Sequence, residues 1–279
     1  MQITRVCGVY FSPCGSVEKV ITEMAGFAAK ELHVPLVEYS FTLPTDRKSG
    51  FDFKSTDLIF FGTPVYAGRV PNKIMPYIKD AFWGNGAIAV PVVVFGNRNF
   101  DDALIELRNL LEDNMFHTIA ASAIVARHSF SEVIASDRPN EEDFADMRKF
   151  VDKVLKKLEH SSKEELEEPI SVPGTNPPEK YYVPLGIDGK PAKFLKAYPK
   201  TDLTKCDHCS ICSCACPMGS IDMSDPQKVS GICIKCQACI RKCPQKAKYF
   251  DDEAFLSHKQ MLEKNYIRNT QSHFFISDL

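Results

Sequence analysis

Short apolar runs alternate with helical patterns through residues 1–160, and this alternation predicts a parallel sheet with helices on both faces. The last three apolar runs are almost continuous, as in strands that are buried on both sides. The predicted strands are Ile3–Phe11, Val34–Tyr39, Asp57–Gly62, Ala87–Gly96 and Thr118–Arg127. The predicted helices are Ser16–Leu32, Pro71–Phe82, Asp101–Glu112 and Glu141–Leu158. Cys7 and Trp83 are predicted core residues of this doubly wound α/β domain.

The pattern changes after His160. Residues 161–200 contain seven prolines and no sustained periodicity, which predicts a linker that packs along a surface. Residues 201–250 are too few to bury a core of their own, so something other than hydrophobic burial must hold them together. Residues 251–279 are predicted to form one amphipathic helix over Asp251–Asn269, followed by a tail.

The composition is that of an ordinary globular protein, with 44% hydrophobic residues, 25% charged residues and a formal net charge of -2. This balance gives no field that would attract nucleic acid. The first residues lead directly into a strand without the pattern of a signal peptide, and the longest apolar run, Ala87–Phe95, is too short to span a bilayer. We therefore expect a cytoplasmic protein with no membrane or nucleic-acid partner, and we expect its cysteines to be reduced rather than paired in disulfides.

Nine of the 11 cysteines fall within residues 206–243, where the spacing C-x2-C-x2-C-x3-C-P occurs twice, 27 residues apart. In this pattern three thiolates bind one cubane iron–sulfur cluster, and the fourth cysteine, before proline, turns away to bind the other cluster. Zinc is the alternative, but its sites close with four ligands and do not need a third cysteine plus a proline. The predicted ligands of the first cluster are Cys206, Cys209, Cys212 and Cys243. Those of the second cluster are Cys233, Cys236, Cys239 and Cys216.

This region resembles bacterial-type ferredoxins with two 4Fe-4S clusters, and all eight ligand positions match. The resemblance implies one-electron transfer. Ile211, Ile234 and Ile240 are expected to supply an apolar shell around the sulfurs. Cys214 is an additional cysteine, which is either a spare thiol packed beside the cluster or an exchangeable or redox-active ligand. His208 is either a solvent-facing side chain or a donor to a cluster sulfur.

Three loops follow predicted strands at the edge where parallel sheets bind ligands. The first, Ser12–Val17, is a turn of small residues that opens a helix and can present hydroxyl and backbone N–H groups to a phosphate. Tyr66 lies in a loop bracketed by glycines after the third strand, and Phe100 lies beside polar groups after the fourth. A phosphate loop followed by two aromatic loops suits flavin mononucleotide (FMN).

Residues 1–160 resemble flavodoxins, and the whole chain resembles flavodoxin/ferredoxin fusion proteins. The resemblance implies an α/β, doubly wound, five-stranded parallel flavodoxin-like sheet in the order 2-1-3-4-5, followed by a small α+β ferredoxin-like domain. The phosphate loop implied by the resemblance is Ser12, Pro13, Cys14, Gly15, Ser16 and Val17. One wall of the ring site is Pro64, Val65, Tyr66 and Ala67. The other wall is Gly96, Asn97, Arg98, Phe100 and Asp101.

Several of these residues have a second interpretation. Cys14 and Val17 stand where flavodoxins usually place threonine or serine, so fewer hydroxyls are available and weaker FMN binding is expected. The alternative interpretation of Cys14 is a reactive thiol. The alternative interpretation of Tyr66 and Phe100 is that they only pack against neighbouring side chains. Arg98 is expected to face either the flavin or a nearby carboxylate. The segment from residue 84 to 89 matches a dinucleotide pattern but precedes a strand, so it predicts no nicotinamide site.

Two one-electron centres and a flavin on one chain indicate transfer of electrons to a redox partner protein or small electron acceptor. No catalytic acid–base or nucleophilic constellation is apparent, so we predict no catalytic residues. One alternative is a flavin-dependent reductase of a small organic substrate, with a pocket lined by Tyr181, Tyr182 and Phe194. Another is an oxygen or redox sensor. The sequence leaves open whether cluster and flavin meet within one chain or between the chains of a homodimer.

Overall fold

The structure is a computed structural model that describes residues 2–277. Its strands are β1 (Arg5–Tyr10), β2 (Leu36–Ser40), β3 (Phe51–Asp52), β4 (Asp57–Pro64), β5 (Phe82–Trp83), β6 (Ile88–Phe95), β7 (His117–Thr118), β8 (Ala120–Val125), β9 (Lys200–Thr201), β10 (Lys248–Tyr249) and β11 (His273–Ile276). Its α-helices are α1 (Ser16–Leu32), α2 (Met75–Ala81), α3 (Ala103–Asp113), α4 (Glu141–His160), α5 (Lys163–Glu167), α6 (Ile211–Cys214), α7 (Ala238–Arg241) and α8 (Glu253–Asn265). A short 3-10 helix, η1, spans Pro44–Arg47.

The main sheet has the strand order β11-β8-β6-β4-β1-β2, with β7 paired to β6. All its pairings are parallel except that of β11 with β8. The strand β11 was expected to be part of an irregular tail. It is a strand because the backbone of His273–Ile276 pairs with residues 120–123 and covers what would otherwise be an open sheet edge.

The second predicted helix is shorter than expected. Pro71 begins a turn in which the N–H groups of Ile74 and Met75 both donate to its carbonyl, and regular helix starts only at Met75. After Ala81 the chain extends into β5, where Trp83 is 42% exposed, so the prediction that Trp83 belongs to the core is wrong. Cys7, by contrast, is completely buried in β1, as predicted.

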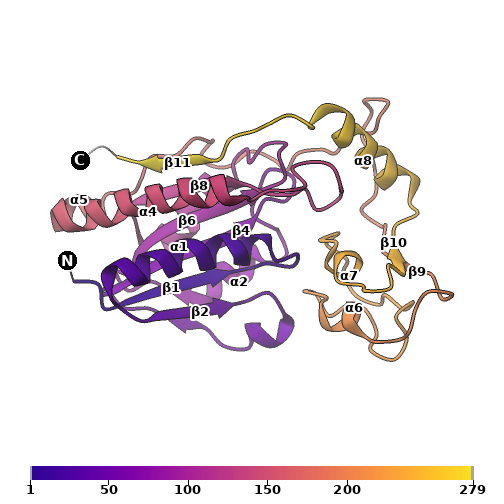
Figure 1. The fold of residues 1–279 in the computed structure, drawn as a ribbon, viewed down its shortest axis with the longest axis horizontal. Coiled ribbons are helices and arrows are strands. Elements are labelled where there is room, and N and C mark those ends of the chain that lie inside the picture. Colours follow the sequence, from indigo (N-terminus) through magenta and orange to yellow (C-terminus); the bar gives the residue numbers. More distant parts are fainter. Residues whose placement is uncertain (1, 278–279) are drawn as a thin grey trace.

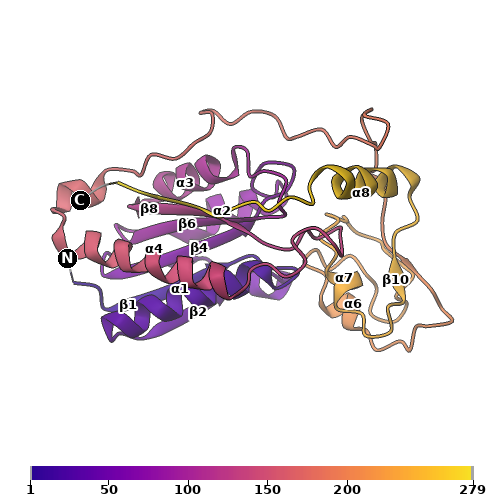
Figure 2. The same ribbon diagram turned by 45° about the horizontal axis from the view of Figure 1, so that its top comes forward.

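Two hydrophobic layers enclose the sheet. The helices α1 and α4 cover one face, and α2 and α3 cover the other (Figure 1 and Figure 2). The close approach of α1 to the sheet depends on Gly62, because a Cβ atom there would lie 2.5 Å from Ile21 and 2.7 Å from Val17. This packing holds the start of α1, and therefore the loop before it, at the carboxyl end of β1.

The linker is docked along the domain rather than loose. Leu166 and Ile170 are buried in the two layers, and the Ile170 N–H donates to the carbonyl of Thr118. Further along, Asp102 accepts hydrogen bonds from the backbone N–H groups of Thr175 and Glu179. Figure 2 shows this segment running along the side of α3 to reach α8.

The cysteine-rich unit lies beyond the carboxyl ends of the parallel strands, at the opposite end of the molecule from both chain termini (Figure 1). The helix α8 follows the unit. Its Phe255 belongs to a small apolar cluster that also contains Phe194 and Phe250. Among the described residues no helix is long and apolar enough to cross a membrane.

The return of the chain from α8 to β11 depends on Asn97. Its side-chain N–H groups donate to the carbonyls of Tyr266 at 2.6 Å and Arg268 at 2.7 Å, and its backbone is left-handed, with φ 67. We expect Asn97→Ala to lower the free energy of unfolding by about 2–3 kcal/mol, from two lost hydrogen bonds and one strained alanine. Urea unfolding with an unchanged m-value measures this loss.

Asn97→Gly is the matched control, because it removes the same two hydrogen bonds but tolerates the left-handed backbone. It should be about 1 kcal/mol more stable than Asn97→Ala. Equal stability of Asn97→Ala and the wild type would show that Asn97 does not hold this segment.

Candidate functional site

The two cysteine motifs form a structural repeat as well as a sequence repeat. The helices α6 and α7 begin 27 residues apart, each after a left-handed residue, Ser210 or Gln237. In each half a backbone N–H four residues beyond the last motif cysteine donates to its sulfur at 3.3 Å, from Ser220 to Cys216 and from Ala247 to Cys243. Hydrogen bonds to sulfur are one of the ways in which proteins tune cluster potentials.

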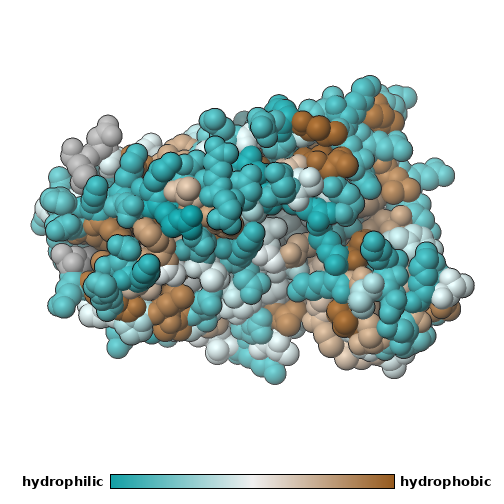
Figure 3. All heavy atoms as spheres, in the orientation of Figure 1, coloured by the Kyte–Doolittle hydropathy of each residue, from teal (hydrophilic) through white to brown (hydrophobic). Residues whose placement is uncertain are grey.

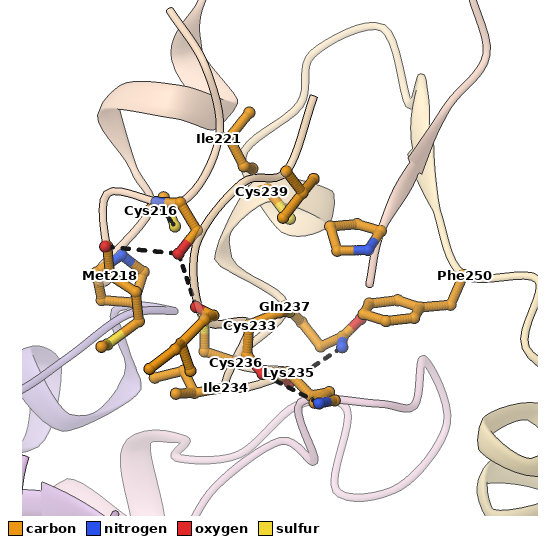
Figure 4. Close-up of a pocket in the computed structure, with 15 residues that line it drawn as sticks. Cys216, Met218, Ile221, Cys233, Ile234, Lys235, Cys236, Gln237, Cys239 and Phe250 are labelled. Carbon is orange, nitrogen blue, oxygen red and sulfur yellow. Dashed lines mark hydrogen bonds between the residues drawn. The ribbon is translucent and has the colours of Figure 1, made fainter. Parts of the chain in front are cut away.

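One small cavity of about 20 Å³ lies between the halves, with apolar walls that include Ile221 and Val229 (Figure 4). It is lined by Cys216, Cys233, Cys236 and Cys239, the residues predicted to bind the second cluster. Burial raises the pKa of Cys239 to about 12 and that of Cys236 well above its usual value. Without a cation to balance them, these sulfurs are neutral thiols, and a bound metal would have to deprotonate them.

The predicted ligands of the first cluster come from two segments that contact each other. Gln245, two residues after Cys243, donates to the carboxylate of Asp207, which lies between Cys206 and Cys209. Cys212 is buried, and Cys209 is exposed. Within residues 2–277, no three His, Cys, Asp or Glu side chains are close enough together to hold a single metal ion.

The second half of the repeat docks on the carboxyl ends of the strands. The Arg241 guanidinium donates to the carbonyls of His128 at 2.6 Å, Ser129 at 3.1 Å and Ser131 at 3.2 Å. Cys214 occupies the position equivalent to Arg241 in the first half, where it is exposed. The two halves therefore differ at this position: Arg241 contacts the loop after β8, whereas Cys214 is exposed. The first half instead contacts the α/β part through Pro217, whose carbonyl accepts from Arg47 at 2.5 Å.

The predicted phosphate loop touches the cysteine unit directly. The Cys14 thiol donates to the carbonyl of Cys236 at 2.8 Å, and burial raises the pKa of Cys14 to about 11, which argues against a reactive thiol. Gly15 is left-handed, with φ 89, and turns the chain into α1. Ser12 accepts the Glu18 N–H at 2.9 Å, while the N–H groups of the first turn of α1 have no intrahelical partner.

A cavity of about 80 Å³ adjoins this loop, and Arg127 lies on its wall. The Nε atom of Arg127 is buried and, among the described residues, has no hydrogen-bond partner. Arg127 is also within electrostatic range of Cys14. Its guanidinium pairs through one terminal nitrogen with the carboxylate of Glu132, and its Nε–H is left as a donor where fewer hydroxyl groups are available for a phosphate. Cys236 lines this cavity too.

The loop of Tyr66 forms a tight turn in which Tyr66 and Arg69 exchange backbone hydrogen bonds of 2.9 and 3.1 Å. Within the turn Gly68 has φ 80, and a Cβ atom there would collide with Asp101. This contact packs the Tyr66 loop against the loop after β6. Tyr66 and Gly96 both line the smaller cavity, so the two predicted ring walls face one space.

The smaller cavity continues into a larger one of about 560 Å³, which shares Tyr66, Gly96 and His128 with it. The aromatic residues Tyr181, Tyr182 and Phe194 line this larger cavity, as the reductase alternative requires. A volume of this size is within the usual range for a small-molecule site.

Some predicted cofactor residues have other roles. Gly15, Asn97, Phe100 and Asp101 are absent from the walls of both cavities. Phe100 is a packing residue, with its ring centroid 5.5 Å from that of Phe95, which matches its second interpretation. Arg98 pairs with the carboxylate of Asp101 and lies 4.1 Å above the ring of Tyr182, while also lining the larger cavity.

The predicted site lacked three residues that directly follow the fifth parallel strand: Arg127, His128 and Ser129. Burial lowers the pKa of His128 to about 3, so its imidazole is neutral. Its Nδ1 accepts the Phe130 N–H at 3.1 Å, which leaves a hydrogen on Nε2. The rule that ligands bind at the carboxyl ends of strands would have found this loop had it been applied to the last strand.

No protein-family model matches this chain, and no curated protein matches it. Among solved structures, a flavodoxin from the domain Archaea is 12% identical with a TM-score of 0.41, and the match covers 56% of this chain and 100% of that one. A flavodoxin of Streptococcus pneumonia TIGR4 is 16% identical with a TM-score of 0.39, covering 55% and 99%. An NADH:FMN oxidoreductase in its apo form is 13% identical with a TM-score of 0.41, covering 57% and 91%.

The docking of the cysteine unit can be tested through Arg241. We expect Arg241→Ala to loosen the unit, because three backbone carbonyls lose a charged donor, each such bond being worth about 1.5–3 kcal/mol before compensation by water. Limited proteolysis of the full chain should then cut within residues 161–200 at least about tenfold faster. This factor corresponds to a decrease of about 1.4 kcal/mol in the free energy of local opening.

The repeat supplies the control. Cys214→Ala changes the equivalent position of the first half, where the side chain is exposed, and should leave the proteolysis rate unchanged. Equal rates for Arg241→Ala and the wild type would mean that the arginine contacts do not hold the unit in place.

Proposed function

We propose that this chain transfers electrons between a redox partner, two 4Fe-4S clusters and FMN. The observation that carries the proposal is the position of Cys236, which lines both the cavity formed by four cysteines and the cavity beside the phosphate and ring loops. A cluster and a flavin in these two cavities would be neighbours within one chain, without a contribution from a second copy.

The cysteine unit fits two clusters. Four thiols, contributed by both motifs, surround one cavity in the grouping that the repeat spacing predicts. We assign Cys233, Cys236, Cys239 and Cys216 to this second cluster. We assign Cys206, Cys209, Cys212 and Cys243 to the first. Bound clusters would cross-link a unit that has little hydrophobic core of its own.

The α/β part, residues 1–160, fits FMN. The phosphate would meet the N–H groups of Ser16 and Val17, at the positive end of the α1 dipole, and the free Nε–H of Arg127. The ring would lie between the loops of Tyr66 and Gly96. Bound FMN can exchange one or two electrons, whereas each cluster exchanges one.

The arrangement also suggests where an electron-donating partner protein binds. The ligands assigned to the second cluster line a cavity beside the sheet loops, whereas the first cluster's assigned ligand Cys209 is exposed. Exposed apolar side chains lie in the segments around the first motif, including Leu203 at 49%, Ile211 at 39% and Met223 at 59% exposure. Figure 3 shows hydrophobic patches at this end of the molecule. We assign the partner contact to this surface and the electron path to the order first cluster, second cluster, FMN.

Paired ligand variants test the path. The anaerobically purified wild type should contain about eight irons and one flavin per chain. We expect Cys209→Ser to lower the iron content and to slow reduction of the flavin by a low-potential ferredoxin at least about tenfold, because the first cluster loses a ligand. Iron content, flavin content and stopped-flow flavin reduction provide the readout.

Cys214→Ser is the matched control, because it lies in the same motif but outside the assigned ligand set. It should retain wild-type iron and wild-type flavin reduction. The cluster assignment is wrong if the wild type contains zinc in place of iron, and the path is wrong if Cys209→Ser reduces its flavin at the wild-type rate.

Arg127 provides a test of the FMN site. Arg127→Gln should weaken FMN binding by about 10- to 100-fold, the equivalent of 1.4–2.7 kcal/mol, because the charged group whose buried Nε–H is proposed to donate to the phosphate is lost. Quenching of FMN fluorescence on titration of flavin-depleted protein measures the dissociation constant.

Arg148→Gln makes the same chemical change at the surface pair with Glu23, which does not line the cavity, and should bind FMN as the wild type does. The assignment of Arg127 to the phosphate fails if the two variants bind FMN equally well.

A further inference from the structure

The larger cavity extends beyond the place proposed for the flavin ring. Its far walls are formed by chain segments outside the α/β domain: Tyr182 and Phe194 from the linker, His258 from α8, and Ile232–Lys235 from the second cysteine motif. The linker wall is fixed in position, since the Tyr182 N–H donates to the carbonyl of Ala67 at 2.8 Å and the Tyr181 hydroxyl donates to that of Val70 at 2.9 Å.

The walls of this cavity combine apolar side chains with positively charged ones. Lys73, Arg98 and Lys235 line it, whereas none of its lining residues, all of them within the described part of the chain, is Asp or Glu. Asp101, which does not line the cavity, pairs with Arg98 and neutralises part of its charge. Lys235 donates to the carbonyl of Cys233 at 3.0 Å and to that of Leu195. The remaining positive charge favours an anion, and the aromatic side chains favour a flat one.

Two neutral imidazoles add hydrogen-bonding groups of opposite kind. His128 carries its hydrogen on Nε2, as described above. His258 is 5% exposed and its Nδ1 lies 2.7 Å from the carbonyl of Leu185, so Nδ1 must donate and Nε2 is left as an acceptor. Burial lowers the pKa of His258, so it is uncharged at neutral pH. The two imidazoles that line the cavity therefore differ in kind, one with a hydrogen on Nε2 and the other with a lone pair there.

We infer that the larger cavity binds a flat organic anion, such as an aromatic or conjugated carboxylate, beside the flavin ring. The inference rests on the proposed function, because the flavin would form one wall of the site. The carboxylate would lie toward Arg98, and the apolar part would lie among Tyr182, Phe194 and Phe130. The positive charge at Arg127 belongs to the phosphate end and is separate from this group.

Binding of model compounds to the FMN-loaded, cluster-loaded protein tests the inference. Benzoate is the flat anion, benzamide its neutral counterpart, and cyclohexanecarboxylate a non-planar anion. Perturbation of the flavin absorption spectrum and titration calorimetry, both under anaerobic conditions, measure binding. We expect benzoate to bind at least tenfold more tightly than either other compound, and Arg98→Gln to reduce this preference over benzamide at least tenfold.

Arg148→Gln, the same change outside the cavity, should bind benzoate as the wild type does. Equal binding of benzoate and benzamide by the wild type, or no binding of benzoate at millimolar concentration, would overturn the inference without reference to any variant. FMN and iron are measured in the same samples. Loss of FMN contradicts the proposed function, whereas normal FMN content without benzoate binding contradicts only the anion site.

Discussion

The contact between Arg241 and the loop after β8 determines how the two parts of the molecule fit together. One guanidinium donates to the carbonyls of His128, Ser129 and Ser131, and so joins the cysteine unit to the backbone of this loop by charged hydrogen bonds. The same contact brings Cys236 against Cys14 and holds His128 at the junction of the two cavities. Two further direct contacts support the same docking: the Cys14 thiol donates to the carbonyl of Cys236, and the Arg47 guanidinium donates to that of Pro217 at 2.5 Å.

The repeat within the cysteine unit is symmetric in its backbone and asymmetric in its surface. Left-handed residues occur at equivalent positions in both halves, such as His208 and Lys235, because each motif must wrap its sulfurs in the same way. The side chains between the ligands are free to differ, and they do: Arg241 docks on the loop after β8, whereas Cys214 is exposed. The two halves therefore share a backbone conformation but present different side chains to their surroundings.

Local signals in the sequence predicted the elements that depend on local physics. The bounds of α1 are those predicted, because Gly15 begins it and a regular apolar face follows. The repeat spacing also groups Cys216 with the second motif, and Cys216 lines one cavity with Cys233, Cys236 and Cys239; that these four bind one cluster stays a prediction. The strand β11 could not be predicted in this way, because four residues at a sheet edge carry too weak a pattern. The strand-end rule could have pointed to the loop of Arg127 and His128, but the burial of the Arg127 Nε atom and of the His128 ring depends on residues far apart in the chain.

The larger cavity has walls from the sheet loops, the linker, the second cysteine motif and α8, so no single segment encloses it. Three of these four walls adjoin the cysteine unit, which on the proposed function is folded by its metal. A newly made chain without iron would then bind FMN at the sheet edge but leave the ring open to solvent and oxygen. Iron supply would thus act as a maturation checkpoint that decides when the flavin becomes enclosed.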